Sequence, residues 1–222
     1  MDQNKFIETL ASDLKPVRPL RPPWMRALFW FALATGLTAL VLYGVQEYRP
    51  GFLEQLNGHG RFQLEIAAGL VWTLLTFYLV FASSIPGIQI HPAVKAACLL
   101  SFLVFAGSLV SGFWIAAPES SRLGARAACE LEVFVYGGLT MGGLFYLIRN
   151  GILVPYSWSP AWIGSAGGMI SALLMQLACM YDPWHGLAFH FGPAVILGVA
   201  GWLLSEKIKT RLERKPQRLS SS

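Results

Sequence analysis

Six apolar segments of about twenty residues dominate the pattern of hydrophobic and polar positions along the 222-residue chain. A helix needs about twenty apolar residues to cross the hydrocarbon layer of a membrane, so each segment predicts one transmembrane helix. The pattern therefore predicts an all-α fold, a polytopic membrane protein built as a bundle of six transmembrane helices. The predicted spans are Trp24–Val45, Phe62–Ser84, Ala96–Ala117, Glu130–Ile148, Ala161–Met180 and Leu187–Leu204.

The spans divide the chain into three parts. Residues 1–23 form a polar N-terminal tail, residues 24–204 the transmembrane domain, and residues 205–222 a basic C-terminal tail. The first apolar segment begins after about two dozen polar residues and is too long for the apolar core of a signal peptide, so we expect no cleavable signal.

The distribution of Lys and Arg predicts the orientation. Thirteen of the 17 fall in the two tails, at Arg26 just inside the first span, or in the second-to-third and fourth-to-fifth connections, and the other side has only Arg49, Arg61, Arg122 and Arg126. Because Lys and Arg collect in cytoplasmic loops, both termini are expected in the cytoplasm. The net charge of +5 then reflects topology, and we expect contact with the lipid bilayer but no direct nucleic-acid partner.

Composition also argues against a sizeable soluble domain. The chain is 55% hydrophobic and 13% charged, whereas about 25% of the residues in a soluble domain are charged.

The stretch LACMYDPWHGLAFHFGP, residues 177–193, gathers reactive side chains between two apolar segments. With the predicted topology it is extracytoplasmic, as is Cys129, which precedes the fourth span. A helix rises about 1.5 Å per residue, so Cys129 and Cys179 should both lie near the outer rim of the bundle. Whether they form a disulfide stays open. Cys98, near the other rim, is expected to be a small buried apolar residue.

Thiolate and imidazole ligands together suit zinc, cadmium or copper. Cys129, Cys179, His185 and His190 are therefore a candidate set of metal ligands. The spacing Cys-x5-His-x4-His matches no established zinc pattern, so we expect no resident cofactor and at most a transient heavy-metal ion.

Three ionisable residues, one of them already named, fall within the outer ends of spans, where they are costly unless partnered. They are Glu65, Glu132 and His190. We expect them to form a buried ionisable layer in which they pair with one another or with loop backbone.

Small residues four positions apart predict close helix packing among the last three spans. They are Gly138 and Gly142, then Gly164, Gly168 and Ala172, then Ala194 and Gly198.

The N-terminal tail predicts a short amphipathic helix over residues 4–14, followed by an extended tether with four prolines. Phe6, Ile7, Leu10 and Leu14 form one apolar stripe on this helix. A helix of this length is marginal by itself in water. It must therefore lie either on the membrane surface or in a groove on a cytosolic partner.

The order of these features resembles the NrsF family of bacterial anti-sigma factors. The matching parts are FIETLASDL (residues 6–14), the Pro/Arg tether, six spans, Glu65, IPGIQIHP (residues 85–92), Cys129 and LACMYDPWH (residues 177–185). Members of this family hold an extracytoplasmic-function sigma factor at the inner membrane. The resemblance implies that Phe6, Ile7, Leu10 and Leu14 bind the sigma factor. It also implies that Cys129 and Cys179 sense heavy-metal or oxidative stress.

The sequence thus favours a non-enzymatic, multi-pass protein of the bacterial inner membrane that binds a sigma factor. The alternative is a membrane thiol oxidoreductase or a metal transporter. An oxidoreductase should show a CxxC pair, and a transporter should show polar residues at the middle of its spans. Neither stands out in this sequence.

Overall fold

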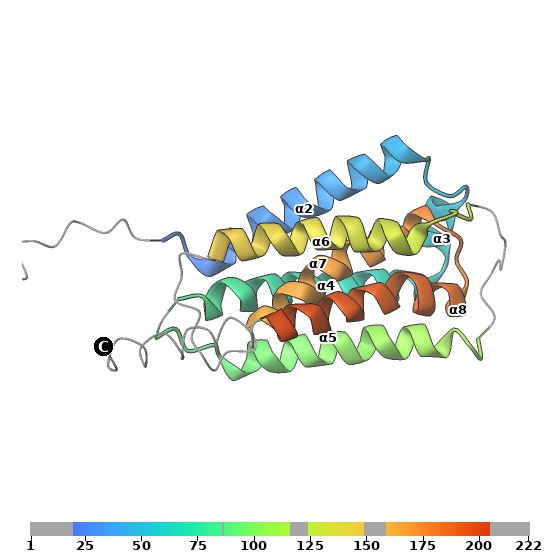
Figure 1. Cartoon of the computed structure of the whole chain (residues 1–222). Coiled ribbons are helices and arrows are strands. Elements are labelled where there is room, and N and C mark those ends of the chain that lie inside the picture. The colour runs from blue at the N-terminus through green and yellow to red at the C-terminus, as the bar shows by residue number, and fades with distance from the viewer. Residues whose placement is uncertain (1–19, 86, 116–123, 149–158, 205–222) are drawn as a thin grey trace, which may run out of the picture.

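The structure is a computed structural model that describes residues 20–85, 87–115, 124–148 and 159–204 (Figure 1). Within these ranges all regular structure is helical, and six helices are long and apolar enough to cross a membrane. They are α2 (Pro23–Val45), α4 (Gly60–Ser83), α5 (Pro92–Ser111), α6 (Cys129–Ile148), α7 (Ser159–Ala178) and the last span (Pro183–Leu204). The prediction of an all-α bundle with six spans is confirmed.

The last span is not a uniform α-helix. It begins with the single turn α8 (Pro183–His185) and continues through the π-helix η1 (Gly186–Phe191) before regular α-helix resumes. Its start is earlier than the predicted Leu187, because Asp182 caps the first turn and its carboxylate accepts a hydrogen bond from the His185 N–H at 2.7 Å.

The third span is also displaced from its predicted limits of Ala96–Ala117. Helix α5 begins at Pro92, which needs no N–H partner at the first turn, and the His91 ring accepts a hydrogen bond from the Ala93 N–H at 3.2 Å. Helix α5 ends at Ser111, while residues 116 and 117 lie outside the described ranges. A short helix that the apolar pattern did not predict, α3 (Phe52–Gly58), follows Gly51, whose φ of 76° favours glycine.

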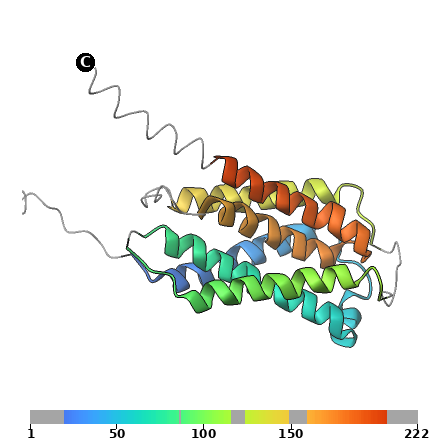
Figure 2. The ribbon, with the colours of Figure 1, turned by 90° about the horizontal axis from the view of Figure 1, so that it is seen from below.

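Helix α7 lies at the centre of the bundle. It packs against α6 on one side, α4 on another, and η1 and α2 besides, and most of its residues are buried. Seen from below, α7 lies between the last span and α4 (Figure 2). Helix α2 is the opposite case, since few of its residues are buried and it rests mainly on α4.

The bundle has two distinct ends. Helix α2 begins and the last span ends at one of them, which we call the terminal end (Figure 1). Helix α2 ends and α6 and α8 begin at the other, which we call the thiol end because Cys129 and Cys179 lie there.

Glycine permits the close approach of α7 to its neighbours. A Cβ on Gly168 would lie 2.7 Å from the Cα of Ala194 in the last span, and one on Gly167 would lie 2.6 Å from the backbone oxygen of Gly137 in α6. Gly164 and Gly198 also meet their neighbouring helices closely. The predicted tight packing of the last three spans is therefore observed, with one exception.

The exception is the pair Gly138 and Gly142, for which the expected packing role is wrong. Added Cβ atoms there would meet nothing within 4 Å, and Gly137 makes the contact instead. Spacing alone does not say which side of a helix faces its neighbour, because helix surfaces facing lipid are as apolar as those facing protein.

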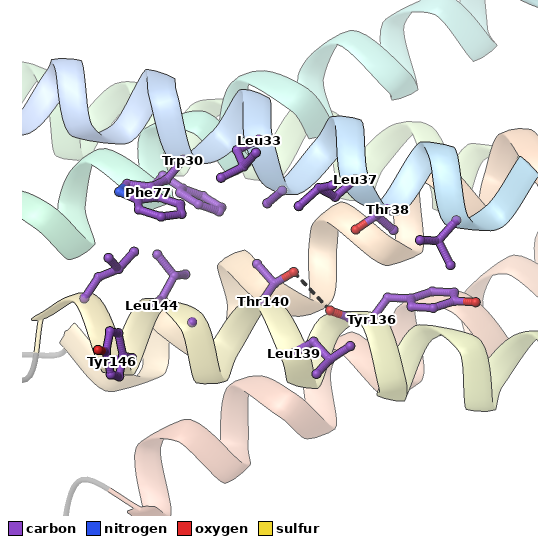
Figure 3. A pocket seen from close by; sticks show the side chains of 14 residues that line it. Trp30, Leu33, Leu37, Thr38, Phe77, Tyr136, Leu139, Thr140, Leu144 and Tyr146 are labelled. Atoms are coloured by element: carbon purple, nitrogen blue, oxygen red, sulfur yellow. Dashed lines mark hydrogen bonds between the residues drawn. The ribbon is translucent and has the colours of Figure 1, made fainter. Parts of the chain in front are cut away.

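A groove of about 480 Å³ separates α2 from α6 (Figure 3). Leu33 and Leu37 line it from α2, and Leu139 and Leu144 line it from α6. The Thr140 hydroxyl in its wall donates to the Tyr136 carbonyl of its own helix at 3.0 Å, so the groove presents mainly hydrocarbon. Helix α2 therefore packs on α4 and α7 rather than along α6.

Candidate functional site

Four potential metal-ligating side chains meet at the thiol end. They are Cys129, Cys179, His185 and His190, and their ligand atoms all lie within 4.8 Å of one another. Cys129, Cys179 and His190 are buried, while His185 is half-buried. The sequence placed the two thiols at similar depth; the structure also places them on adjacent surfaces of α6 and α7.

Local structure positions each cysteine. Cys129 is the first residue of α6, and Cys179 directly follows α7 with its backbone N–H still bonded to the Met175 carbonyl at 2.7 Å. Because glycine lets α6 and α7 pack backbone to backbone, the start of one helix and the end of the other lie together. Both thiols are free.

The π-helix η1 brings the two histidines together. In an α-helix of 3.6 residues per turn, residues five apart point about 140° away from each other. A π-helix bonds residue i to i+5, which returns the fifth residue to nearly the same face. The rings of His185 and His190 accordingly lie 5.0 Å apart, edge to face. No periodicity in the sequence predicts this widened turn.

His185 lies between the two thiols. Its Nε2 is 3.2 Å from the Cys129 Sγ and 3.4 Å from the Cys179 Sγ. The Asp182 cap fixes the turn that carries His185. His190 is fully buried, and neither of its ring nitrogens has a hydrogen-bond partner within the described residues.

The two cysteines differ in electrostatic environment. A hydrogen bond from the Cys129 thiol, with smaller contributions from His190 and the Arg126 backbone, holds the pKa of the Cys179 thiol below its ordinary range. Cys129 instead contacts the carboxylate of Glu130 at 3.7 Å. Cys179 is therefore the thiol that is more readily present as a thiolate, the form that attacks oxidants and binds metals.

The three residues of the expected ionisable layer pair neither with one another nor with loop backbone within the described residues, so that expectation is wrong. Glu65 is buried and accepts hydrogen bonds from Gln176 and from the Tyr181 hydroxyl, the latter at 3.3 Å. Glu132 pairs with Arg126 at 2.7 Å, and His190 belongs to the thiol cluster. Glu65 and Glu132 are each bonded to side chains of a neighbouring helix or loop, whereas His190 has no hydrogen-bond partner within the described residues.

Arg126 is the residue that sequence reasoning missed. Its buried guanidinium binds Glu132 and also donates to the carbonyls of Leu42 and Gln46, at 3.1 and 2.5 Å. It thus joins the segment leading into Cys129 to the end of α2. An arginine three residues before a cysteine was the available signal, but the two carbonyls that it binds lie some eighty residues away in the sequence.

One comparison with known proteins found a match. The family described as NrsF, negative regulator of sigma F, matches residues 10–208 and so most of the chain. The chain belongs to this family. No curated protein and no solved structure matches it significantly.

Membership in the NrsF family makes the chain a relative of negative regulators of a sigma factor, and the six spans indicate a multi-pass membrane protein. The family points to a regulatory rather than a catalytic role. The predicted sigma-binding residues lie outside the described ranges, so their role stays a prediction; they are Phe6, Ile7, Leu10 and Leu14.

Proposed function

We propose that this chain is an anti-sigma factor of the bacterial inner membrane, with both termini in the cytoplasm. Its N-terminal tail sequesters an extracytoplasmic-function sigma factor. Heavy-metal or oxidative stress acts on Cys129 and Cys179 outside the membrane and releases that factor. The tail binds through its apolar stripe of Phe6, Ile7, Leu10 and Leu14.

One observation carries this proposal. The two thiols of a chain in the NrsF family meet with two imidazoles at the end of the bundle opposite the start of α2, where the tail joins. A pair of thiols this close can be joined by oxidation or bridged by a soft cation. Either event changes how the ends of α6 and α7 are held.

Release also requires coupling across the membrane. Changing a partner from 99% bound to 99% free requires a shift of about 5.5 kcal/mol between two states. Helices α6, α7 and the last span converge on the thiol cluster, and Arg126 ties the same region to α2. Movement at the thiols therefore has a contiguous route to the helix that carries the tail.

The test is co-purification from detergent-solubilised membranes of the native host. Full-length protein should recover a sigma factor, identified by mass spectrometry, whereas protein lacking residues 1–23 should not. A variant lacking residues 205–222 is the matched control and should recover it normally. If neither full-length nor C-terminally truncated protein recovers a sigma factor, the proposal is wrong. A membrane transporter or thiol oxidoreductase is then the better interpretation.

A point variant tests the stripe within the tail. Leu10→Asp places a charge on the apolar face, and a desolvated charge in a groove is expensive. Transcription from the sigma-dependent promoter should rise while membrane insertion stays normal. Lys15→Ala is the control and should have a smaller effect, because exposed charges contribute little.

A further inference from the structure

We propose that Cys129, Cys179, His185 and His190 together form a four-ligand site for a soft divalent cation of the zinc and cadmium class. The histidines are then ligands and not only neighbours of the sensor thiols. The inference rests on the proposed function only where it assigns the site to stress sensing; the coordination itself is argued from geometry and charge.

The separations between ligand atoms fit a tetrahedral site. With metal–sulfur bonds of about 2.3 Å and metal–nitrogen bonds of about 2.0–2.1 Å, a sulfur and a nitrogen ligand should lie roughly 3.5 Å apart. The His185 Nε2 lies 3.2 Å from one thiol sulfur and 3.4 Å from the other. All four ligand atoms fall within 4.8 Å of one another, so small side-chain rotations are enough to complete the tetrahedron.

Charge balance favours a divalent ion. Binding forms two metal–sulfur bonds and two metal–nitrogen bonds and releases the protons of the thiols to water. Two thiolates and two neutral imidazoles around a doubly charged cation give a neutral complex. A neutral complex suits a place where three of the four ligands are buried, since an uncompensated buried charge is costly.

The ligand types select against hard cations. Calcium and magnesium bind oxygen ligands, whereas sulfur and nitrogen ligands suit zinc and its softer relatives. His190 adds an independent argument, because it is fully buried and both ring nitrogens lack hydrogen-bond partners within the described residues. Coordination would provide the partner that one of these nitrogens lacks.

The site would link three spans at one point. Cys129 begins α6, Cys179 follows α7, and the two histidines belong to the start of the last span. A bound ion would therefore fix the relative positions of three helix ends, and the Asp182 cap would hold the turn between two of the ligands. Disulfide formation would use the same thiols, so ion binding and oxidation are mutually exclusive.

The experiment is titration of the purified, reduced, full-length protein in detergent with Co²⁺ and then Cd²⁺. Tetrahedral Co²⁺ bound to thiolates should give visible ligand-field bands, and Cd²⁺ should displace it with a thiolate charge-transfer band in the ultraviolet. We expect one ion per chain.

His185→Ala and His190→Ala should each weaken Co²⁺ binding by at least about tenfold, since even outer-shell partners change metal affinity by about that much. His91→Ala and Cys98→Ser, which lie outside the cluster, are the controls and should bind like the unaltered protein.

Two results overturn the inference. One is no saturable binding by the unaltered protein, and the other is unchanged affinity and spectra in both histidine variants, which would leave the thiols as the only protein ligands. Helical circular dichroism without metal checks that each variant is folded, and the half-buried His185 provides the test if His190→Ala does not fold. None of these measurements involves a sigma factor. A site that binds Cd²⁺ without releasing the sigma factor would therefore refute the proposed function and leave the site intact.

Discussion

Glu65 is an acidic side chain with 1% of its surface exposed inside a membrane span. Its carboxylate is held by Gln176 from α7 and by Tyr181 from the turn that follows. Burial raises the pKa of the Tyr181 phenol, so the hydroxyl stays protonated and can donate. These partners explain how the bundle accommodates a carboxyl group at this depth, where an unpartnered one would be costly.

Removal of one partner should therefore cost more than removal of both. Gln176→Leu leaves a buried carboxylate short of a donor, and we expect a loss of about 1–3 kcal/mol in the free energy of unfolding. Replacing both residues, Glu65→Leu with Gln176→Leu, should restore much of that loss. Thermal denaturation in detergent measures both effects. The exposed Gln63→Leu is the control, and a double variant that is less stable than Gln176→Leu alone would contradict this account.

At the scale of the helices, stability depends on the faces by which α6, α7 and the last span meet. Gly137, Gly164, Gly167 and Gly168 lie where backbones approach, whereas Gly138 and Gly142 face open surroundings. Substitution of Gly137 in α6 should therefore disturb helix packing, whereas substitution of the adjacent Gly138 should not.

Gly167→Ala should destabilise the bundle. Its new Cβ would lie 2.6 Å from the Gly137 backbone oxygen and 2.9 Å from the Met141 nitrogen, and backbone atoms cannot rotate away. Overpacking of this kind costs about 1–3 kcal/mol, which should appear as a lower melting temperature in detergent. Gly142→Ala is the matched control. It should be neutral or stabilise by up to about 1 kcal/mol, because alanine favours helix.

Arg126 should matter for communication between elements. Its guanidinium joins the segment before Cys129 to the carbonyls of Leu42 and Gln46 at the end of α2. Under the proposed function, Arg126→Gln should blunt release of the sigma factor by cadmium while Co²⁺ binding stays within a few-fold of normal. Reporter transcription and metal titration measure the two properties separately.

Arg61→Gln is the control for that experiment. Arg61 lies at the same end of the bundle but donates to the Ser108 carbonyl of α5 rather than to α2. Induction should therefore be retained. Equal loss of induction in both variants would indicate a general effect of removing charge at the thiol end and not a specific link through α2.

At the scale of the whole molecule, the even number of spans places the two ends of the transmembrane domain on the same side. The charge distribution predicts that this side is the cytoplasm, which leaves the thiol end outside. Under the proposed function, stress sensing at the thiols and sigma-factor binding by the tail would then occur on opposite sides of the membrane.

Labelling in intact cells tests this orientation. Two variants start from a protein in which all three native cysteines are replaced by serine. In one, Trp184→Cys introduces a thiol at an exposed position of the thiol end; in the other, Ile88→Cys introduces a thiol at an exposed position of the terminal end. A membrane-impermeant maleimide should label the first in intact cells and the second only after permeabilisation. The reverse pattern would show that the termini lie outside and would rule out sequestration by the tail.

The sequence by itself determined the number of spans and the approximate depth of the residues within them. Backbone groups in hydrocarbon must be bonded within the helix, so a long apolar segment leaves few alternatives. The fixed rise per residue then places Cys129 and Cys179 at the same rim before any packing is known. For this reason the sequence could predict that the two thiols lie at a similar depth in the membrane.

Only the tertiary structure decided which way each residue faces. Lipid is as apolar as the interior of the bundle, so the pattern of apolar residues does not separate buried helix faces from exposed ones. Gly137 rather than Gly138 therefore meets α7, and Glu65 pairs with Gln176 rather than with His190. The π-turn of η1 rotates His190 onto the side of His185 and the thiols. That rotation depends on backbone hydrogen bonding and packing that no periodicity in the sequence records.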